Sequence, residues 1–337
     1  MHEGLRLIIM GYVSVIIPNW NGKHHLPYCL DSLAVQTYSD FEVILVDNGS
    51  RDGSAAYVLE NYPWVKLVEL PGNIGFSGGN NRGLIECHGD YVVTLNNDTK
   101  VAPTFLTELV QVVRDDARVG MVAAKILNFH ETDRIDSVGI RSTTAGIGVN
   151  HGVGETDKGQ YDSLDGIFGP CAGAALYRRT MLEEVGFFDP DFFAYYEDLD
   201  LAWRGRLAGW LCVAAPGAVV YHVHSATGGR MSPFTVYHVH RNKWYVLLKN
   251  WPAPLLLQNL PGILAYDMAS LLLASLKGRF TPALLARLHV VRDFLSLMAK
   301  RREITGLKKV CTTEIASFVA SGGSPLKTFF RKMGSGI

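Results

Sequence analysis

The feature that most constrains the fold of this chain is an alternation of short apolar runs and helix-like stretches between Val13 and about Ala124. The apolar runs have the length of buried strands, and the stretches between them have helical spacing. The strand-like runs are Val13–Ile17, Val43–Val46, Val65–Glu69, Tyr91–Leu95 and Val119–Ala124, and the helix-like stretches lie near His24–Gln36, Ser54–Asn61, Ser77–Glu86 and Pro103–Asp115. This alternation predicts βαβ units and an α/β fold, with a mostly parallel central sheet and helices on both faces.

The alternation ends after Ile126, and the rest of the chain divides into two parts. The elements predicted for the first part are irregular strands or a hairpin around Ile135–Val149, a helix over Leu199–Leu207, and short strands over Leu211–Ala214 and Ala218–Val223. From Phe234 onward the pattern is helical throughout. We therefore expect one domain over residues 12–230 and a C-terminal helical region over residues 231–320.

Composition and charge exclude several classes of function. The chain has 337 residues, 48% of them hydrophobic, which is enough to bury a substantial core in roughly two domains. Its 32 basic and 32 acidic residues balance, so no global field favours nucleic acid as a partner. The five cysteines are scattered and lack CxxC spacing, which predicts reduced, mostly buried thiols of a cytosolic protein. The apolar stretch Leu5–Met10 is too short for the apolar core of a signal peptide.

Five loops rich in acids and amides predict a ligand-binding crevice. They are Pro18-Asn19-Trp20-Asn21, Asp47-Asn48-Gly49-Ser50, Asn73-Ile74-Gly75-Phe76, Asn96-Asn97-Asp98 and Glu197-Asp198-Leu199-Asp200. The first, second and fourth each follow a predicted parallel strand, and the carboxyl ends of parallel strands face one crevice. Side chains of these types suit a ligand with a base, a diphosphate that needs a metal ion, and a hydroxyl that must lose a proton. A nucleotide-sugar and its acceptor fit that description.

The first two ligand-binding candidates also have structural interpretations. Asp47 can accept hydrogen bonds from a base or a ribose hydroxyl, or its loop can simply form a turn that caps the next helix. The glycine-rich segment Asn73–Gly83 offers amides to phosphate or sugar oxygens at a helix start, but it lacks the GxGxxG spacing of a dinucleotide site. Arg82 within it either assists a diphosphate or is a solvated surface charge.

The acidic candidates have two interpretations as well. Asp98 can hold Mg²⁺ or Mn²⁺ while a diphosphate supplies other ligands, or Asn96-Asn97-Asp98 can cap the helix near Pro103. The acids of Glu197–Asp200 can offset the dipole of a helix's first turn. The aromatic residues just before them favour a desolvated carboxylate instead, with a pKa raised toward a value useful for a general base.

These motifs together resemble the inverting glycosyltransferases of family two, and within that family the bacterial rhamnosyltransferase-like branch. The motifs that carry the resemblance are Val13–Asn21, Asp47-Asn48-Gly49-Ser50, Asn73–Gly83, Leu95–Thr99, Glu197–Asp200 and His222. They occur in one order, and the resemblance covers residues 12 to about 305. It implies a nucleotide-binding GT-A fold as the catalytic domain, with Mg²⁺ or Mn²⁺ as the cofactor.

The resemblance also implies a role for each matching position. Asp198 takes the place of the catalytic base with Glu197 beside it, and Asp98 takes the place of the last, metal-binding aspartate of the family's Asp-x-Asp element. His222 stands where relatives place a histidine near the diphosphate and the metal ion. The implied donor-binding positions are Pro18, Asn19, Asn21, Asp47, Asn48, Asn73, Gly75, Asn80 and Asn97, and the implied acceptor-binding positions are Gly173 and Asp200.

Two departures from the family pattern concern the metal site. Asn96 replaces the first aspartate, so the metal ion has one charged ligand fewer. His224 stands where glycine is common, and the sequence does not choose between His222 and His224 as the ligand. A different interpretation joins these two with His238 and His240 in a four-histidine zinc site, unless the last two begin a helix, where side chains two apart diverge.

The C-terminal region has the composition of a membrane-surface element. Between Lys249 and Lys277 only Asp267 is charged, and interrupting prolines and amides favour a helical hairpin in the membrane interface over a transmembrane span. The next predicted helix, Ala283–Arg302, combines an apolar band with basic residues suited to anionic headgroups. The band is Leu284, Leu285, Leu288, Val291, Leu295 and Met298, and the basic residues are Arg287, Arg292, Lys300, Arg301 and Arg302. The alternative is a helical cap packed on the catalytic domain or on a second copy, as in a homodimer.

We therefore expect a cytoplasmic enzyme, peripheral at the inner face of the plasma membrane, that builds cell-surface polysaccharide. It would move a hexose or deoxyhexose from a nucleotide diphosphate to a glycan or polyprenyl-linked acceptor, with dTDP-rhamnose as the first donor to test and UDP-sugars or GDP-mannose next. The main alternative is a non-catalytic nucleotide-sugar-binding subunit of an assembly complex. Retention of Asp98 and of the Glu197-Asp198 pair favours the enzyme. A nucleotidyltransferase would need a triphosphate loop, which Asn19–Lys23 matches poorly.

Overall fold

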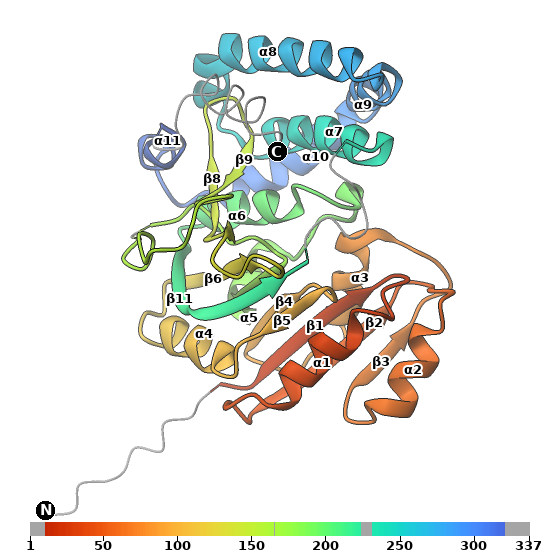
Figure 1. The fold of residues 1–337 in the computed structure, drawn as a ribbon. Coiled ribbons are helices and arrows are strands. Elements are labelled where there is room, and N and C mark those ends of the chain that lie inside the picture. The colour runs from red at the N-terminus through yellow and green to blue at the C-terminus, as the bar shows by residue number, and fades with distance from the viewer. Residues whose placement is uncertain (1–10, 165, 224–230, 321–337) are drawn as a thin grey trace, which may run out of the picture.

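The computed structural model describes residues 11–164, 166–223 and 231–320. Within these residues the centre of the fold is a nine-stranded sheet of order β3-β2-β1-β4-β10-β6-β11-β5, with β7 beside β6 (Figure 1). Its strands are β1 (Val13–Asn19), β2 (Phe41–Asp47), β3 (Lys66–Glu69), β4 (Tyr91–Leu95), β5 (Thr99–Val101), β6 (Val119–Asn128), β7 (Ile135–Ser137), β10 (Ala174–Arg178) and β11 (Leu211–His222). Strands β8 (Ile140–Ser142) and β9 (Gly148–Asn150) form a separate antiparallel hairpin.

Most strands of the sheet run in one direction. Strands β1 to β4 are parallel to one another, while β10 is antiparallel to both β4 and β6. Strand β6 therefore runs with β4, and β11 runs parallel to β6. The register pairs Asn19 at the end of β1 with Asp47 at the end of β2, so the polar loops begin at the same sheet edge. The predicted α/β fold with a mostly parallel sheet is confirmed.

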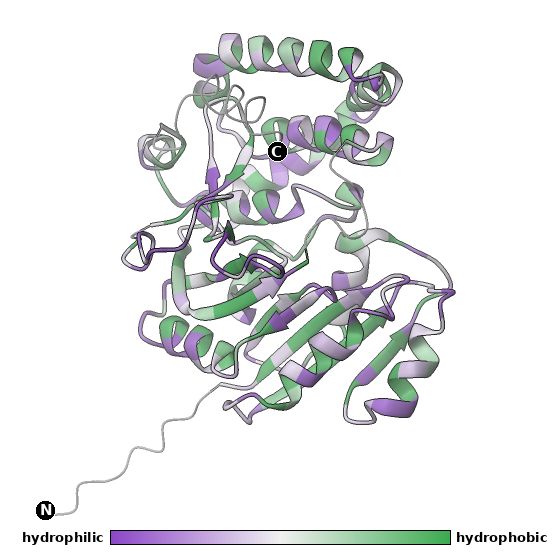
Figure 2. Ribbon diagram, in the orientation of Figure 1, coloured by the Kyte–Doolittle hydropathy of each residue, from purple (hydrophilic) through white to green (hydrophobic). Residues whose placement is uncertain are grey.

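Helices cover both faces of the sheet because neighbouring residues of each strand point to opposite sides. Val13, Val15 and Ile17 of β1 belong to one core cluster, and Ile16 belongs to the other. The helices on the first side are α1 (Leu26–Ala34), α2 (Ser54–Asn61) and α4 (Phe105–Arg114), and those on the second are α3 (Gly75–Leu84), α5 (Arg179–Val185) and α6 (Glu197–Leu207). Figure 2 shows the strands between these layers as largely hydrophobic.

The C-terminal region consists of helices that stack above α6 (Figure 1). They are α7 (Pro233–Asn250), α8 (Ala253–Leu276), α9 (Phe280–Arg292), α10 (Phe294–Gly306) and α11 (Thr312–Ala320). Helix α7 packs against α6 below it and against α9 and α10. The region is helical, as the sequence pattern predicts.

Two details of that prediction are wrong. The predicted hairpin is one continuous helix, α8, which runs through Pro261. Proline cannot donate to the carbonyl of Leu257, but both residues are exposed, so water can satisfy that carbonyl and the helix continues. The single helix predicted over Ala283–Arg302 is two helices, which meet at Asp293.

Three further differences lie in the sheet. Strands β5 and β10 are absent from the sequence prediction because each is short and pairs only with strands distant in the chain. The two strands predicted before His222 are one strand, β11, with an irregularity between Ala215 and Val219. The cysteines are free, and Cys29, Cys87 and Cys212 are buried, which agrees with the expectation of mostly buried thiols.

Candidate active site

Asn19 ties together the loops that follow β1, β2 and β4. Its Nδ2 donates to Asp47 Oδ1 at 3.0 Å and to Ser50 Oγ at 3.2 Å, and its Oδ1 accepts from Asn97 Nδ2 at 2.7 Å. Asp47 Oδ2 accepts from the Ser50 backbone N–H at 2.9 Å, which closes the turn. Asn21 has a left-handed backbone with φ of 51° and accepts from the Arg51 N–H at 2.8 Å. Four of the predicted donor-binding residues thus form one hydrogen-bonded cluster.

A second cluster holds the glycine-rich loop at the start of α3. Asn48 Nδ2 donates to the Gly75 carbonyl at 3.1 Å, and Asn73 Oδ1 accepts from the Gly75 N–H at 2.8 Å. Gly75 has φ of +82°, and a Cβ there would lie 2.4 Å from the Phe193 carbonyl oxygen, so only glycine fits. Asn80 is fully buried, and its Oδ1 has no hydrogen-bond partner.

Two other residues of this region lie in different surroundings. Gly79 lets α3 approach Pro18, because a Cβ at Gly79 would be 3.3 Å from the Pro18 Cβ. Arg82 pairs with Glu86 at 3.0 Å on the protein surface, which agrees with its interpretation as a solvated charge.

Asp98 and His222 lie together where β4 and β11 end. His222 Nε2 is 3.2 Å from Asp98 Oδ1 and 3.2 Å from Asn96 Nδ2, while His222 Nδ1 is 2.8 Å from Asp136 Oδ2. Burial alone lowers the pKa of His222, but its hydrogen bonds with Asp136 and Asp98 raise it to about 9. Burial raises the pKa of Asp98, and the bond with His222 outweighs this and lowers it below the usual value. An imidazole between two carboxylates is a strongly polarised group.

The donor set of this pair fits a hard divalent cation. Asp98 offers a carboxylate oxygen, and His222 offers an imidazole nitrogen once a cation displaces the proton that its raised pKa favours. No group of three or more His, Cys, Asp or Glu side chains that could hold a metal ion occurs in the described part of the chain. Two protein ligands leave the remaining positions to diphosphate oxygens and water, which is the usual arrangement for Mg²⁺ bound together with a substrate phosphate.

The structure bears on one of the two open questions about the histidines, the four-histidine zinc site. His224 lies outside the described residues, so the choice between it and His222 is not tested. His238 and His240 are within α7, where His238 stacks on Phe193 and His240 Nδ1 lies 3.1 Å from Arg287 Nη1. These two side chains have different partners from His222, which does not support the four-histidine zinc site.

Glu197 and Asp198 open helix α6 and differ sharply in their surroundings. Asp198 is partly exposed, and its oxygens accept from the backbone N–H groups of Leu199 at 2.7 Å and Ala172 at 3.3 Å. Desolvation raises the pKa of Asp198 to about 6, although these hydrogen bonds oppose the shift. Glu197 is buried with its Oε2 unpartnered, and burial together with the charge of Asp198 raises its pKa well above the usual value. The pKa values of the two neighbouring carboxyls are therefore raised by different surroundings, a pattern seen where two acids take different roles.

The loop before β10 connects the surroundings of His222 with those of Asp198. The Asn96 N–H donates to the Gly173 carbonyl at 2.9 Å, and Ala172, one residue earlier, donates to Asp198. A Cβ at Gly173 would lie 3.3 Å from Asn96 Nδ2, a tight contact. Asn96 therefore touches His222 on one side and the loop that holds Asp198 on the other.

Asp200 faces away from this crevice and into the protein. It is fully buried, and its oxygens bind Arg204 Nε at 3.0 Å, Lys249 Nζ at 2.8 Å and Asn250 Nδ2 at 2.8 Å. A carboxylate with three charged or amide partners and no exposure cannot contact an acceptor without rearrangement. Its surroundings are those of an anchor between α6 and α7.

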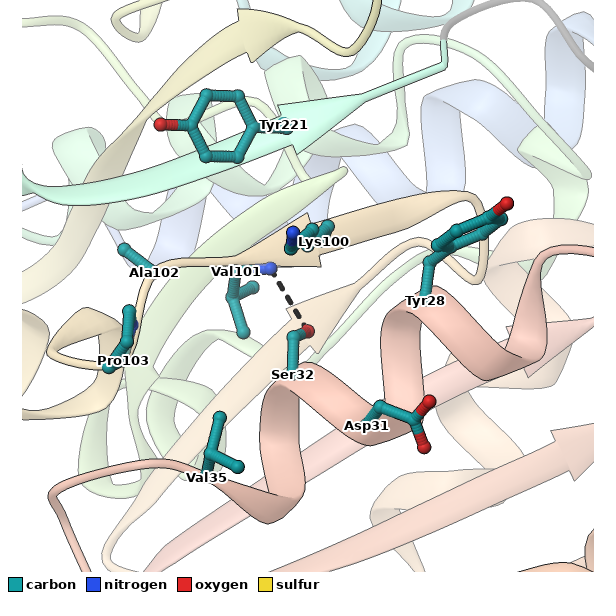
Figure 3. A pocket seen from close by; sticks show the side chains of 9 residues that line it. All are labelled: Tyr28, Asp31, Ser32, Val35, Lys100, Val101, Ala102, Pro103 and Tyr221. Carbon is teal, nitrogen blue, oxygen red and sulfur yellow. Dashed lines mark hydrogen bonds between the residues drawn. The ribbon is translucent and has the colours of Figure 1, made fainter.

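The groove between α1, β5 and β11 is separate from the predicted site (Figure 3). It has a volume of about 500 Å³ and is lined by Tyr28, Asp31, Ser32, Val35, Lys100, Val101, Ala102, Pro103 and Tyr221. None of the predicted site residues lines it. Ser32 Oγ in its wall accepts from the Val101 N–H at 3.1 Å, a contact that holds β5 to α1.

Sequence patterns missed two residues of the site. Asp136 stands between Ile135 and Ser137 in a segment with no motif, and only the tertiary fold brings it to His222. Asn242 lies in the C-terminal region and contacts the segment before Glu197. Neither position carries a local signal, because each contacts residues at least 47 positions away in the chain.

Comparison with known proteins agrees with this site. The family model described as glycosyl transferase family 2 matches residues 14–186, which are 173 of the 337 residues. The chain belongs to glycosyl transferase family 2. It is a glycosyltransferase of the rhamnosyltransferase-like kind that depends on a nucleotide-sugar.

One curated relative spans most of the chain. It is the N-acetylglucosaminyl-diphospho-decaprenol L-rhamnosyltransferase of Mycobacterium tuberculosis, 27% identical over 267 residues, with 72% of this chain and 87% of the relative covered.

Two solved structures support the GT-A-like fold. The mannosyltransferase PcManGT from Pyrobaculum calidifontis, in complex with GDP-Man and Mn²⁺, has a TM-score of 0.55 at 20% identity and covers 89% of this chain and 86% of its own. GalNAc-T7 with UDP, GalNAc and Mn²⁺ has a TM-score of 0.63 at 16% identity, with 86% of this chain and 58% of that chain covered.

Proposed function

We propose that this glycosyltransferase is a metal-dependent, inverting enzyme that moves rhamnose or another hexose from a nucleotide diphosphate to a lipid-linked or glycan hydroxyl. The observation that carries the proposal is the hydrogen-bonded path from His222 through Asn96 and Gly173 to Asp198. This path links the proposed cation ligands, Asp98 and His222, to a carboxylate whose pKa is raised. A transfer needs both, since one end must release a diphosphate while the other removes a proton.

The residues divide the reaction between them. The acceptor oxygen forms a bond to C1 of the sugar, the C1–oxygen bond to the diphosphate breaks, and Asp198 takes the proton of the acceptor hydroxyl. A bound Mg²⁺ or Mn²⁺ would neutralise the charge on the departing diphosphate, held by Asp98 and His222. The clusters around Asn19 and Asn48 would orient the nucleotide. A single displacement of this kind gives a product of inverted configuration.

The substrates are proposed from the relative with the longest match described above. The name of that relative gives an L-rhamnosyl group as the transferred sugar and N-acetylglucosaminyl-diphospho-decaprenol as the acceptor. We propose dTDP-rhamnose as the first donor for this chain, with UDP- or GDP-sugars next, and a polyprenyl-linked acceptor. Residues 12–230 would form the catalytic domain, and residues 231–320 would contact the acceptor or the membrane.

A donor screen tests the proposal. The full chain would be incubated with dTDP-rhamnose, UDP-sugars and GDP-mannose, with Mn²⁺ or with EDTA, and release of the nucleoside diphosphate would be measured. We expect Mn²⁺-dependent release with one donor and, with an acceptor, a product of inverted anomeric configuration by NMR. Release that is equal in EDTA would contradict metal dependence, and a retained configuration would contradict single displacement. No release with any donor would favour the non-catalytic subunit.

The outer surface of α8 supports the proposed membrane contact at the cytoplasmic face. Within the described residues α8 is the one helix long and apolar enough to cross a membrane by length and composition. Leu264, Met268, Leu272 and Leu276 follow one another at a spacing of four and are 47%, 62%, 61% and 76% exposed. The single charge of the helix, Asp267, faces inward and binds Lys243 Nζ at 2.5 Å and Arg287 Nε at 2.9 Å. An uncharged outer face of this length suits the apolar part of a membrane interface.

Most of the basic side chains expected to bind headgroups already have intramolecular partners. Arg287 binds Asp267, Arg292 binds Asp293, Lys300 binds Asp189 and Asp191, and Arg301 donates to backbone carbonyls. Arg302 is exposed. The apolar side chains of α8 and α9 therefore carry the membrane proposal, and the electrostatic contribution is smaller than the sequence suggests.

Vesicle binding tests this surface. Leu264→Glu with Leu272→Glu should abolish flotation with liposomes of bacterial polar lipid, because each glutamate would enter the apolar layer. The matched control is Leu59→Glu on α2, where Leu59 is 62% exposed on the catalytic domain. Flotation that survives the double change would contradict the proposal. A wild-type protein that does not float but is dimeric by light scattering would assign this face to a second copy.

A further inference from the structure

The segment that leads into Glu197 and Asp198 is held in a strained backbone conformation. Phe193, Tyr195 and Tyr196 have φ angles of 63°, 69° and 71°, which L-residues rarely adopt. Phe193 has ψ of −61°, and the Ala194 N–H donates to the Phe192 carbonyl at 2.7 Å, so the chain forms the rare, strained kind of γ-turn there. A conformation of this kind persists only where the surrounding structure enforces it.

Two neighbouring side chains of helix α7 hold this segment: Arg241 Nη2 donates to the carbonyls of Asp191 and Phe192 at 2.6 and 3.2 Å, and Asn242 binds the strained residues themselves. Asn242 is fully buried, and its Nδ2 lies 2.9 Å from the Phe192 carbonyl oxygen, 2.9 Å from that of Ala194 and 2.7 Å from that of Tyr195. Arg241 Nε donates to Asn242 Oδ1 at 3.0 Å, which turns the Nδ2 donors toward the three carbonyls. One amide from the C-terminal region thus binds almost the whole strained turn.

The strained segment leads directly into the first turn of α6. The Asp200 N–H donates to the Tyr196 carbonyl at 2.9 Å, so the backbone of Tyr196 is already part of the helical hydrogen-bond pattern. Asp198 lies between these two residues, with its carboxylate against the Ala172 N–H. A change in φ at Tyr195 or Tyr196 would rotate this first turn and move the carboxylate.

We propose that Asn242 is a positioning residue for Asp198: it fixes the strained turn and thereby aims the base across the crevice. The inference rests on the proposed role of Asp198 and adds that the C-terminal region is required for catalysis and not only for location. Asn242 does not itself contact substrate. The donor loop has a support of its own in the bond from Asn48 to the Gly75 carbonyl, besides the bond from the Ser77 N–H to the Phe193 carbonyl at 3.1 Å.

Kinetics of Asn242→Leu and Asn242→Asp test the inference. Leucine keeps the volume and removes the donors, and aspartate keeps the shape but places an oxygen against the three carbonyls. We expect kcat to fall about 100-fold, the loss typical of a reacting group displaced by about 1 Å, while dTDP or UDP affinity changes less than about threefold. The acid limb of the pH profile should move below that of wild type, because a displaced Asp198 gains water and its pKa falls.

The matched control is Asn250→Leu on the same helix. Asn250 is also buried, but its Nδ2 donates to the Asp200 side chain and not to the strained backbone. A loss of kcat in the Asn242 variants no larger than in Asn250→Leu, or an unchanged pH profile, would overturn the inference. So would parallel loss of nucleotide binding, which would indicate general destabilisation.

Asp198→Asn, measured alongside, separates the two claims. Normal turnover of Asp198→Asn would overturn the proposed base itself, whatever Asn242 does. Impaired Asp198→Asn with normal Asn242 variants would overturn only the positioning role. Thermal unfolding of each variant, with assays run well below the lowest midpoint, ensures that folded protein is compared.

Discussion

The proposed donor side and the proposed base side of the site are built in different ways. On the donor side, Asn19 binds both Asp47 and Asn97, and these residues lie at the carboxyl ends of the parallel strands β1, β2 and β4. On the base side, Asp198 depends on backbone from the loop before β10 and on a turn that Asn242 holds from the C-terminal region. The first arrangement follows from the direction of the strands. The second needs contacts between segments that the sheet does not align.

This difference teaches which part of such a site tolerates change. A cluster formed by loops of one sheet loses one partner and keeps the others, because the strands still fix the loops. A strained turn keeps its conformation only while the side chains of another segment hold it, so the loss of one such contact can change the turn. The base side should therefore be the more sensitive to substitutions distant from the substrate.

The largest effect should come from the base itself. Asp198→Asn should lower kcat by about 10²–10⁴-fold with little change in nucleotide affinity, since the acceptor proton then has no base. Glu197→Gln should cost much less, because burial and the charge of Asp198 raise the pKa of Glu197 well above its usual value and so favour the neutral form that glutamine resembles. Steady-state kinetics with the identified donor would measure both. An inactive Glu197→Gln beside an active Asp198→Asn would exchange the two roles.

The largest effect on the free energy of unfolding should come from Lys249, which joins α7 to Asp189 and to Asp200 of α6. Lys249 Nζ lies 2.5 Å from an oxygen of Asp189 and 2.8 Å from an oxygen of Asp200. Lys249→Met removes this partner from both buried carboxylates and should lower the unfolding free energy by about 3–5 kcal/mol. Urea unfolding would measure it. Lys66→Met, which removes an exposed pair with Glu86, is the control and should change stability little. Equal effects of the two substitutions would contradict a larger contribution of the buried Lys249 ion pairs to stability.

On the metal side, Asp136 gives an intermediate effect. Its carboxylate fixes the ring of His222 through Nδ1, so that Nε2 faces the proposed cation, and second partners of this kind typically contribute about 10–100-fold to metal affinity. Asp136→Asn should weaken Mn²⁺ binding by that factor, measured by the EPR signal of free Mn²⁺ without any turnover. Asp98→Ala should abolish binding and metal-dependent activity, and Asp133→Asn, on the same segment, should change neither. Wild-type affinity in Asp136→Asn would limit Asp136 to a structural role.

The smallest effect is a pH dependence. The ionised form of Asp198 would be the proposed base. Its pKa is raised to about 6, so kcat should be level above that pH and fall about tenfold for each unit below it. A pH–rate profile with donor at saturation would show the slope. A level profile down to pH 4.5 would mean that Asp198 does not titrate in the rate-determining step.

The sequence predicts the parts of this molecule that depend on local pattern. The alternation up to Ala124 predicts the parallel strands, and their polar ends predict the donor-side cluster, because strand direction alone brings them together. The roles of Asp98, His222 and Asp198 came from resemblance to the family, and the metal-site and base assignments stay predictions. Asp136, Asn242 and the inward burial of Asp200 could not be predicted, since each depends on packing between distant segments. The error at α8 has a related cause, because proline is tolerated where its neighbouring carbonyl reaches water.

The position of β10 has a consequence for the order in which the molecule is made. It inserts between β4 and β6, both of which leave the ribosome earlier, so the sheet stays in two pieces until residue 178 has emerged. During that interval β4 and β6 expose unpaired backbone edges of apolar composition, which is the condition that favours aggregation of nascent chains. Slow synthesis of the segment between residues 128 and 178 would prolong the interval. Chaperone supply and codon usage there should influence the soluble yield more than changes elsewhere in the chain.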